Sequence, residues 1–550
     1  MMRKSLAALA FSLPAALSAW GYAPIAGEPS RTPPAAKSVR AAGLAPGSPT
    51  ARIELAPLAS AKLAVESTSA EGADLIGQAR EVPPSAAAAL ASLRWSPADG
   101  MGVVGRISVR SPAAAAMRVA LLVRGAPQGS TIRFSGSASP SDSQALPVSA
   151  TAFWSPVTAG DEQLIELLLP QGADPAAVRV AIEGVSHLHV DPASAAPAVG
   201  GAKSSGSCQQ DVACATPSPS FLNAKRSVAK IVYTRGGTTY ACTGTLLNDA
   251  DPTTQVPYMI TAKHCIDSAA TAASVNTYWF LEAPSCGAKS APDTKQLSGG
   301  AQLLHAGTVS DVALLRLNDP APAGAWFSGL DASPLAMGET AMGLHHPSGD
   351  LKKVSTGRVT LADDRLPQVS WLAGSTEGGS SGSGLFTERD GQYLLRATLR
   401  GGNASCSNSG RLDDPANRDL YQGLQGDLSA IEELLNAGAR PTEDYTDLWI
   451  SPAQPGTGIS VTQQANGNTF VVWFAYDSAG RPTWLTMSAG KWTSATTLSG
   501  EVYRSQRPGA QVSTAPVGHA SFKFTGATQA TLTFTVDGTA GSLPLDRYAF

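Results

Sequence analysis

The chain of 550 residues is too long for one domain, since domains usually span about 100–200 residues, and three to five are expected. Charged residues make up only 15%, against about 25% in typical soluble domains, while 54 glycines and 39 prolines favour turns. A long coiled coil is therefore excluded. The formal net charge of −3 gives no overall attraction to nucleic acid or anionic lipid. The sequence contains no uninterrupted run of 18 apolar residues, so no membrane span is predicted.

The first residues have the pattern of a secretory signal peptide. Arg3 and Lys4 form a positive start, residues 5–16 are mostly apolar, and cleavage is expected after the small residue Ala19. We therefore expect residues 1–19 to be removed during export and the protein to be secreted.

Two β-rich regions flank the middle of the chain. Residues 24–60 are rich in Ala, Pro and Ser and are expected to form a flexible leader. From about 95 to 192, short alternating or apolar runs divided by Gly, Pro and Ser predict an all-β domain. Residues 445–550 predict a second β-rich module with four tryptophans, in which Asp537-Gly538 is typical of a hairpin turn. The middle region also predicts mainly short strands, followed by a helix over 427–437.

All six cysteines lie in the middle region. An even number confined to one region predicts three disulfides in one domain, and export would place them in an oxidising compartment. A metal site is the alternative, but the sequence contains no CxxC or HxxxH pair, so no metal is expected. The cysteines are Cys208, Cys214, Cys242, Cys265, Cys286 and Cys406.

Three residues of the middle region are candidates for nucleophilic catalysis. His264 follows the apolar run YMITA, Asp311 precedes the apolar run VALLRL, and Ser381 lies in the glycine-rich GGSSGSG. Each signal is weak alone, because such residues commonly serve in turns and loops. Their order, His then Asp then Ser, is that of one class of serine hydrolases. Ser380 and Ser383 are the alternative nucleophiles.

The motifs ACTGTLLN, YMITAKHC, SDVALLRL, GLHHP, TEGGSSGSG and GGNASCS stand in this order along the chain. Through them, residues 204–440 resemble a trypsin-like serine endopeptidase, in particular the secreted bacterial lysyl endopeptidases. The resemblance implies an all-β, chymotrypsin-like double β-barrel with its site between the barrels. It also implies Ser381 as nucleophile and the disulfides Cys208–Cys406, Cys214–Cys286 and Cys242–Cys265.

The resemblance assigns a role to each candidate. His264 would take the proton of Ser381 as the hydroxyl attacks a peptide carbonyl, and Asp311 would orient the imidazole. The backbone N–H groups of Gly379 and Ser381 would form the oxyanion hole. No cofactor is expected. The paired histidines of GLHHP are not expected to bind metal, because neighbouring residues of a strand point to opposite faces.

Primary specificity is predicted from an acid near the last cysteine. In the resembling family an Asp at the base of the pocket binds the lysine of the substrate, and the context NRDLYQG matches it to Asp419, with Gly401 and Gly402 as the substrate wall. Asp413 and Asp414 are alternatives, although LDDP is typical of a solvated turn.

Two departures from the family leave the substrate preference of the enzyme open. It could cleave after Lys alone, after Lys and Arg alike, or after another residue. Arg400 stands where the family has His before the paired glycines, and the segment ahead of the serine block, which carries a pocket-adjacent Trp in the family, is shortened.

The resemblance also implies a precursor. Lys203 and Ser204 lie in the linker before Cys208, so an enzyme that cuts after Lys could release residues 20–203 as a propeptide, expected to be a folding aid and inhibitor. The remaining expected partners are protein or peptide substrates, and the enzyme is expected to be a monomer that binds no nucleic acid.

Other functions remain open from the sequence alone. They are a serine protease of other specificity, glutamyl-like or esterolytic, and a catalytically idle adhesion or binding protein with a protease fold. The C-terminal module could bind polysaccharide through exposed aromatics, although Trp in a small β domain more often lies in the core.

Overall fold

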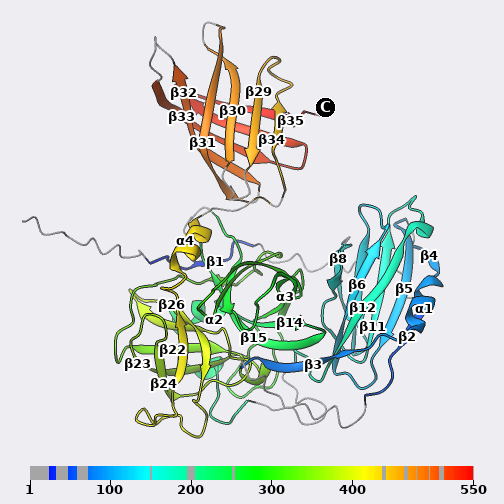
Figure 1. Cartoon of the computed structure of the whole chain (residues 1–550), viewed down its shortest axis with the longest axis vertical. Helices are drawn as coiled ribbons and strands as arrows, with labels where there is room; N and C mark the ends of the chain where they lie inside the picture. Colours follow the sequence, from blue (N-terminus) through cyan, green and yellow to red (C-terminus); the bar gives the residue numbers. More distant parts are fainter. Residues whose placement is uncertain are drawn as a thin grey trace, which may run out of the picture.

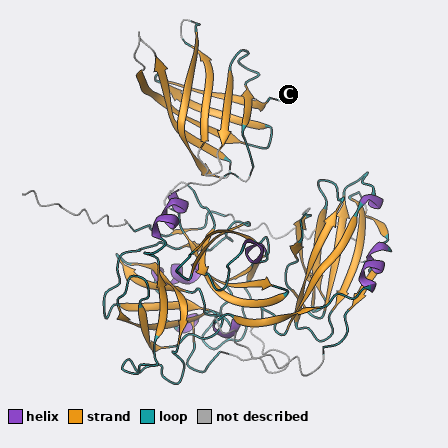
Figure 2. Ribbon diagram, viewed as in Figure 1, coloured by secondary structure: helices purple, strands orange, loops and turns teal. Residues whose placement is uncertain are grey.

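The computed structural model describes most of the chain. The described residues are 24–32, 47–58, 72–98, 100–148, 151–194, 205–249, 254–436, 441, 443–463, 469–477, 480–494, 496–506 and 513–548. The signal peptide and the expected processing site at Lys203 and Ser204 lie outside them. Figures 1 and 2 show three β-rich units joined in sequence.

The N-terminal unit is a sandwich of two sheets. One sheet has the strand order β2-β5-β11-β7-β8, with β4 beside β5. The other sheet contains β10-β6-β12-β3, with β9 beside β6. Alternating apolar residues such as Ile107 and Val109 of β5 and Val119 and Leu121 of β6 point inward and form one buried cluster. The elements are β2 (Ala51–Glu54), β3 (Asp74–Arg80), α1 (Ser85–Ala91), β4 (Trp95–Ala98), β5 (Gly102–Arg110), β6 (Ala116–Arg124), β7 (Thr131–Gly136), β8 (Ser139–Pro147), β9 (Phe153–Trp154), β10 (Thr158–Ala159), β11 (Glu162–Leu169), η2 (Pro175–Ala177) and β12 (Arg179–Leu188).

The middle unit begins with seven paired strands wrapped around one core. β15 pairs with β14 and β16, β16 pairs with β20, β20 pairs with β19, and β14 continues to β17 and β18. Trp279 and Leu315 are fully buried at its centre. The elements are β13 (Gln210–Asp211), η3 (Val212–Cys214), α2 (Pro219–Ser227), β14 (Val228–Arg235), β15 (Thr238–Leu247), β16 (Tyr258–Ala262), α3 (Ala269–Ala273), β17 (Asn276–Trp279), β18 (Lys295–Leu297), β19 (Ala301–Ala306) and β20 (Val312–Leu317).

The second half of the middle unit closes on itself. β22, β23, β24, β27, β26 and β25 pair in a ring, because β23 bonds to both β22 and β24 and β25 bonds to both β22 and β26. This is the expected second barrel, so the double β-barrel fold is confirmed. The elements are β21 (Trp326–Phe327), β22 (Thr340–His345), η4 (Pro347–Gly349), β23 (Lys353–Leu361), β24 (Gln368–Ala373), β25 (Gly384–Arg389), β26 (Gln392–Gly402), β27 (Asp419–Gly423) and α4 (Leu428–Asn436).

The C-terminal unit is a closed eight-stranded barrel. Trp449, Trp473 and Trp492 are buried in its core as expected, whereas Trp484 is 54% exposed. The predicted turn at Asp537-Gly538 joins the last two strands, with both residues at positive φ. The strands are β28 (Asp447–Ile450), β29 (Gly458–Gln463), β30 (Thr469–Tyr476), β31 (Pro482–Ser494), β32 (Thr497–Gln506), β33 (Ser513–Phe524), β34 (Gln529–Val536) and β35 (Thr539–Arg547).

Strand β3 joins the N-terminal sandwich to the first barrel. On one side it pairs with β12 of the sandwich, and on the other side it pairs with β15, with Tyr240 opposite Leu75 and Ala241 opposite Asp74. The two units therefore share one continuous sheet, and β3 runs along the first barrel in Figure 1. Ser186 and Thr239 hydrogen-bond across the same junction at 2.7 Å.

The structure differs from the sequence prediction before residue 95. The leader predicted to be flexible contains β1 (Glu28–Pro29), which pairs with β21, and Ile25, which packs into the core of the middle unit. The sandwich also begins at β2, well before the predicted start. The prediction missed these first strands because short Ala-rich segments give no strand signal of their own. The predicted helix is confirmed as α4. Within the described part of the chain, no helix is long and apolar enough to cross a membrane.

Candidate active site

His264 lies just beyond β16, on a turn that a disulfide holds. β16 ends at Ala262, whose carbonyl accepts a hydrogen bond from the Cys265 N–H. The Cys265–Cys242 disulfide ties this turn to β15. The imidazole is thus fixed from two directions, by its own strand and by the neighbouring one.

Asp311 binds His264 with both carboxylate oxygens, one at the imidazole and one at the backbone. It directly precedes β20, which pairs with β16, so the strand register places the two residues side by side. Its Oδ2 lies 2.7 Å from Nδ1 of His264, and its Oδ1 accepts the His264 backbone N–H at 2.8 Å. This contact assigns the proton to Nδ1 and leaves Nε2 free to act as a base. Nε2 is buried and has no hydrogen-bond partner among the described residues.

The glycine-rich loop before β25 presents Ser381 to the imidazole. Gly379 and Gly382 have φ of +86° and +78°, and a Cβ on Gly382 would lie 2.1 Å from Thr261 Oγ1, so this turn requires glycine. A Cβ built on Gly72 would lie 2.9 Å from Ser381 Oγ and 3.9 Å from His264 Nε2. The hydroxyl and the free ring nitrogen therefore border the same small space.

The two alternative serines are placed differently. Ser380 Oγ lies 2.8 Å from His345 Nδ1 and accepts the Glu377 N–H, so it is engaged on the far side of the loop. Ser383 is fully buried. Of the three serines, Ser381 is the one that borders the space shared with His264.

Gly379 supplies the backbone donor expected of an oxyanion hole. Its N–H donates to the carbonyl oxygen of Gly72 at 3.1 Å, and its own carbonyl accepts a hydrogen bond from Thr243 Oγ1 at 2.9 Å. A carbonyl oxygen therefore already sits where the amide of Gly379 points, beside Ser381.

The paired histidines support the loop and stay neutral. His345 bonds to Ser380 and, through Nε2, to Ser355 Oγ at 3.0 Å, and burial lowers the pKa of His345 to about 3. Nδ1 of His346 lies 3.0 Å from the Asp350 carbonyl, and burial holds the pKa of His346 well below its usual value. Each ring has a hydrogen-bonding role within the fold.

Asp419 is a buried carboxylate beside the predicted substrate wall. It is fully buried, and its Oδ2 accepts hydrogen bonds from Trp371 Nε1 at 2.6 Å and Thr376 Oγ1 at 2.7 Å. Burial raises the pKa of Asp419, although these donors oppose the shift. Its Oδ1 is buried with no hydrogen-bond partner within normal bonding geometry in the described part of the chain, although the nearby Ala404 backbone also helps to lower the pKa of the carboxyl.

Of the two predicted wall glycines, Gly402 lies against this carboxylate. Gly402 pairs with Asp419 between β26 and β27, and a Cβ on Gly402 would lie 2.3 Å from Asp419 Oδ1. Gly401, at φ +149°, has open space on its Cβ side. A side chain at position 402 would collide with the Asp419 carboxylate, so this position requires glycine.

The other acids and the substituted arginine lie outside this arrangement. Asp413 is exposed, and Asp414 pairs with Arg411 at 3.2 Å in the expected turn. Arg400 is exposed at the edge of the cleft.

Three contacts of the site were missed from sequence. Trp371 and Thr376 hold Asp419, and Gln422 Oε1 accepts the backbone N–H of Asp311 at 3.2 Å. Trp371 stands on β24, ten positions before Ser381, so the shortened segment does retain a tryptophan beside the acid. The alternation of QVSWLA signals a strand, but not these partners.

An open cleft of about 630 Å³ connects the catalytic pair to the wall. Its lining residues are Gly72, His264, Thr308, Val309, Ser310, Asp311, Arg400, Gly401, Gly402 and Leu420.

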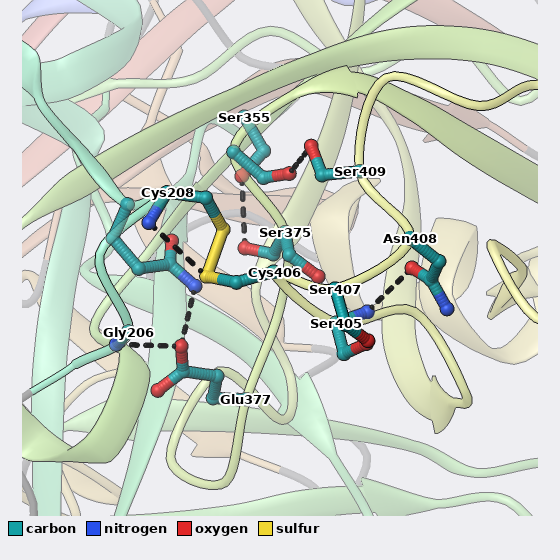
Figure 3. The surroundings of a disulfide bond; sticks show 12 residues. Gly206, Cys208, Ser355, Ser375, Glu377, Ser405, Cys406, Ser407, Asn408 and Ser409 are labelled. Carbon is teal, nitrogen blue, oxygen red and sulfur yellow. Dashed lines mark hydrogen bonds between the residues drawn. A yellow bond between two sulfur atoms is a disulfide. The ribbon is translucent and has the colours of Figure 1, made fainter.

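All three disulfides expected from the resemblance are present: Cys208–Cys406, Cys214–Cys286 and Cys242–Cys265. Figure 3 shows the first of them beside Glu377, whose carboxylate accepts the Gly206 N–H at 2.8 Å and the Gln209 amide at 2.9 Å. The start of the middle unit is thereby anchored four residues before Ser381. The sulfurs near His264 are in a disulfide bond and are not thiolate ligands for a metal.

Comparisons with known proteins relate the first two units of the chain to lysyl endopeptidases. The model of the lysyl endopeptidase N-terminal domain matches residues 49–189, and the model of the lysyl endopeptidase C-terminal domain matches residues 202–422. A lysyl endopeptidase of Pseudomonas aeruginosa is 39% identical over 269 residues, which cover 46% of this chain and 58% of that protein. The chain thus matches less than two thirds of the length of this relative.

Solved structures of the Rv3671c protease from M. tuberculosis are also similar. The active form is 20% identical with a TM-score of 0.26, covering 40% of this chain and 88% of that one. An inactive form is 18% identical with a TM-score of 0.26, covering 40% and 96%. By its two matched domains, the chain is a lysyl endopeptidase-like protein.

Proposed function

We propose that the protein is a secreted serine endopeptidase that cleaves peptide bonds after lysine and is made as a self-processed precursor. The observation that carries this proposal is the convergence of Ser381 Oγ, the free Nε2 of an Asp311-bound His264, and the Gly379 amide on one point. These are the nucleophile, the base and the oxyanion donor that acyl transfer needs.

The reaction would proceed in two balanced steps. Ser381 Oγ attacks the substrate carbonyl carbon while His264 Nε2 takes its proton, and the amides of Gly379 and Ser381 stabilise the oxyanion. The tetrahedral intermediate then expels the amine, which takes the proton from His264. Water, activated by the same nitrogen, hydrolyses the acyl-enzyme and restores Ser381.

Asp419 supports a preference for lysine. A buried carboxylate with a weakly satisfied oxygen favours a cationic partner, since a charge-assisted hydrogen bond would satisfy it. The family match points the same way. Arg400 is exposed and lies at the opening of the cleft, so solvent screens its charge. We therefore favour cleavage after Lys alone over cleavage after Lys and Arg alike.

The precursor form follows from the same proposal. Cleavage after Lys203 would separate residues 20–203, which we propose to act as folding aid and inhibitor of a monomeric enzyme. Export through the N-terminal signal fits the three disulfides, which persist in oxidising compartments.

A catalytically idle binding protein is the principal alternative. Such a protein needs no ordered Asp–His pair and no glycine turn that points an amide into the site. A protease of glutamyl-like or esterolytic type would keep the catalytic residues but would not use the Asp419 carboxylate.

A fluorophosphonate probe tests the nucleophile in secreted protein from which residues 20–203 have been removed. We expect labelling of the wild type, none of Ser381→Ala, and labelling of Ser383→Ala, which removes a neighbouring buried hydroxyl. Circular dichroism should show that all three are folded. Unlabelled wild type would support the idle binding protein and end the proposal. Profiling with a peptide library then tests for cleavage after Lys.

A further inference from the structure

A segment of the N-terminal sandwich enters the catalytic cleft. Residues 72–80, here called the inhibitory segment, comprise Gly72, Ala73 and strand β3. β3 pairs with β15, the strand whose Cys242 is disulfide-bonded beside His264. The pairing continues toward the site until Gly72 lies next to Ser381, where its carbonyl accepts the Gly379 N–H at 3.1 Å.

The position of that carbonyl is the position that a substrate carbonyl needs. An oxyanion hole works by directing backbone N–H groups at the oxygen of the scissile carbonyl. In this structure the Gly379 amide already has a partner, so a substrate must displace Gly72 before it can be polarised.

Gly72 resembles a substrate residue only in its backbone. Its φ is +85°, a conformation that residues with side chains rarely adopt. It also has no side chain to reach toward Asp419, so it gains nothing from the primary pocket. The segment can thus occupy the oxyanion hole without presenting a residue of the preferred kind for cleavage.

Close packing makes glycine necessary at this position. A Cβ on Gly72 would lie 2.9 Å from Ser381 Oγ, nearer than real Cβ atoms approach. The next residue, Ala73, is buried in the core of the first barrel, so the segment cannot simply swing outward to make room.

The rest of the segment is held by an extensive junction. Arg118 of β6 is fully buried and donates to the Ser274 carbonyl at 2.9 Å, and the Val157 N–H donates to Asn276 at 3.1 Å. These contacts join the sandwich to the first barrel independently of Gly72. The segment therefore stays docked after a cut at Lys203, because none of these bonds depends on that peptide link.

We propose that the β15 edge and the oxyanion hole form a docking surface for the inhibitory segment, with the Gly72 carbonyl as a backbone plug that only glycine can provide. This inference rests on the proposed function, since it concerns the same oxyanion hole. It predicts that the uncut chain and the cut but associated chain are both closed.

Two matched pairs of substitutions test the plug in the whole chain. Gly72→Ala adds the clashing Cβ, whereas Gly129→Ala has the same φ of +85° in the same sandwich and open space around its Cβ. From the other side of the junction, Gly237→Ala would place a Cβ 2.7 Å from Ala79 Cβ of β3, whereas its neighbour Gly236→Ala meets nothing within 4 Å.

All variants carry Lys203→Gln, and the readout is fluorophosphonate labelling of the full-length band, with mass spectrometry to verify an uncut chain. Gly72→Ala and Gly237→Ala should label about 10- to 100-fold faster than the parent, as strain of this size shifts a closed state. Gly129→Ala and Gly236→Ala should match the parent. Thermal unfolding identifies any variant that is not folded. If one variant fails to fold, the labelling rates of the other matched pair test the plug.

The outcomes separate this inference from the proposed function. If the parent labels as fast as Gly72→Ala, or if the control substitutions accelerate labelling equally, the plug is wrong while the enzyme stands. If wild type from which residues 20–203 have been cut and removed does not label either, Ser381 is not an activated nucleophile and the proposed function fails with it.

Discussion

Replacing Asp419 by Asn removes the charge of the buried carboxylate while keeping its shape. The amide oxygen can still accept from Trp371 and Thr376, so the contacts that hold the side chain survive. What changes is the partner offered to a substrate cation. A cation left buried without its counter-charge costs about 3–5 kcal/mol, so kcat/KM for lysine peptides should fall about 10²- to 4 × 10³-fold.

The same substitution should stabilise the fold at neutral pH. Burial raises the pKa of Asp419 above the ordinary value of 3.8, so the ionised form is penalised in the folded protein. Below pH 3.8 the folded and unfolded states both hold the proton and the difference vanishes. Above it the penalty grows as pH rises through the raised folded pKa. Relief of a weakly satisfied buried charge contributes about 1–3 kcal/mol, or several degrees in Tm.

Two assays measure these opposite effects. Peptides that differ only in Lys, Arg or Gln at the cleavage position give kcat/KM for each variant, and thermal unfolding at pH 3 and pH 7 gives stability. Gln peptides, which lack the charge, should be cleaved by both forms at similar rates. Asp414→Asn, which removes an acid that is paired with Arg411, is the control. An Asp419→Asn enzyme that still prefers Lys would refute the reasoning.

The remaining predictions concern the catalytic pair, a disulfide and the buried histidines. Asp311→Asn should lower kcat about 10⁴-fold with little effect on folding, because it favours the wrong tautomer of His264, and a preserved kcat would exclude this role. Replacing Cys242 and Cys265 together by Ala opens a loop with a sequence separation of 23 and should cost about 3 kcal/mol in urea unfolding. Stability should decline as pH falls from 6.5 toward 3, since unfolded His345 gains a proton that the folded form refuses until about pH 3. His345→Gln should flatten that decline, and an unchanged profile would assign it to other groups.

The residues proposed to carry the chemistry could be located from the sequence, because their order and the apolar strands beside them can be read along the chain. His264 and Asp311 each adjoin an apolar run, and pairing of β16 with β20 then brings them together. The disulfide pairs came from the family resemblance and not from spacing, which allowed other connectivities. The double barrel of the middle unit was implied by the family resemblance, whereas the N-terminal sandwich and the C-terminal barrel were foreseen only as β-rich regions, because strand partners are set by contacts far apart in sequence.

The supporting contacts of Asp419 show the same limit. Trp371 sits in an alternating strand, and Thr376 lies in the loop toward Ser381, so neither carries a local sign of the carboxylate that it binds. That partner lies more than 40 positions away and becomes a neighbour only when β24 and β27 pair. The segment ahead of the serine block was expected to be shorter than in the family, and Trp371 within it still donates its indole N–H to Asp419.

The inhibitory segment was invisible for a different reason. A nucleophile, a base or a counter-charge needs a particular side chain, and that requirement leaves a mark in the sequence. Gly72 acts through its backbone carbonyl, which every residue has, and β3 binds through a ladder that any strand could form. The single trace is the glycine itself, required by φ +85° and by the 2.9 Å approach to Ser381. Among 54 glycines, Gly72 cannot be singled out until the fold places it beside Ser381. The sequence therefore indicates the chemistry proposed for the site, whereas only the structure reveals that Gly72 occupies it.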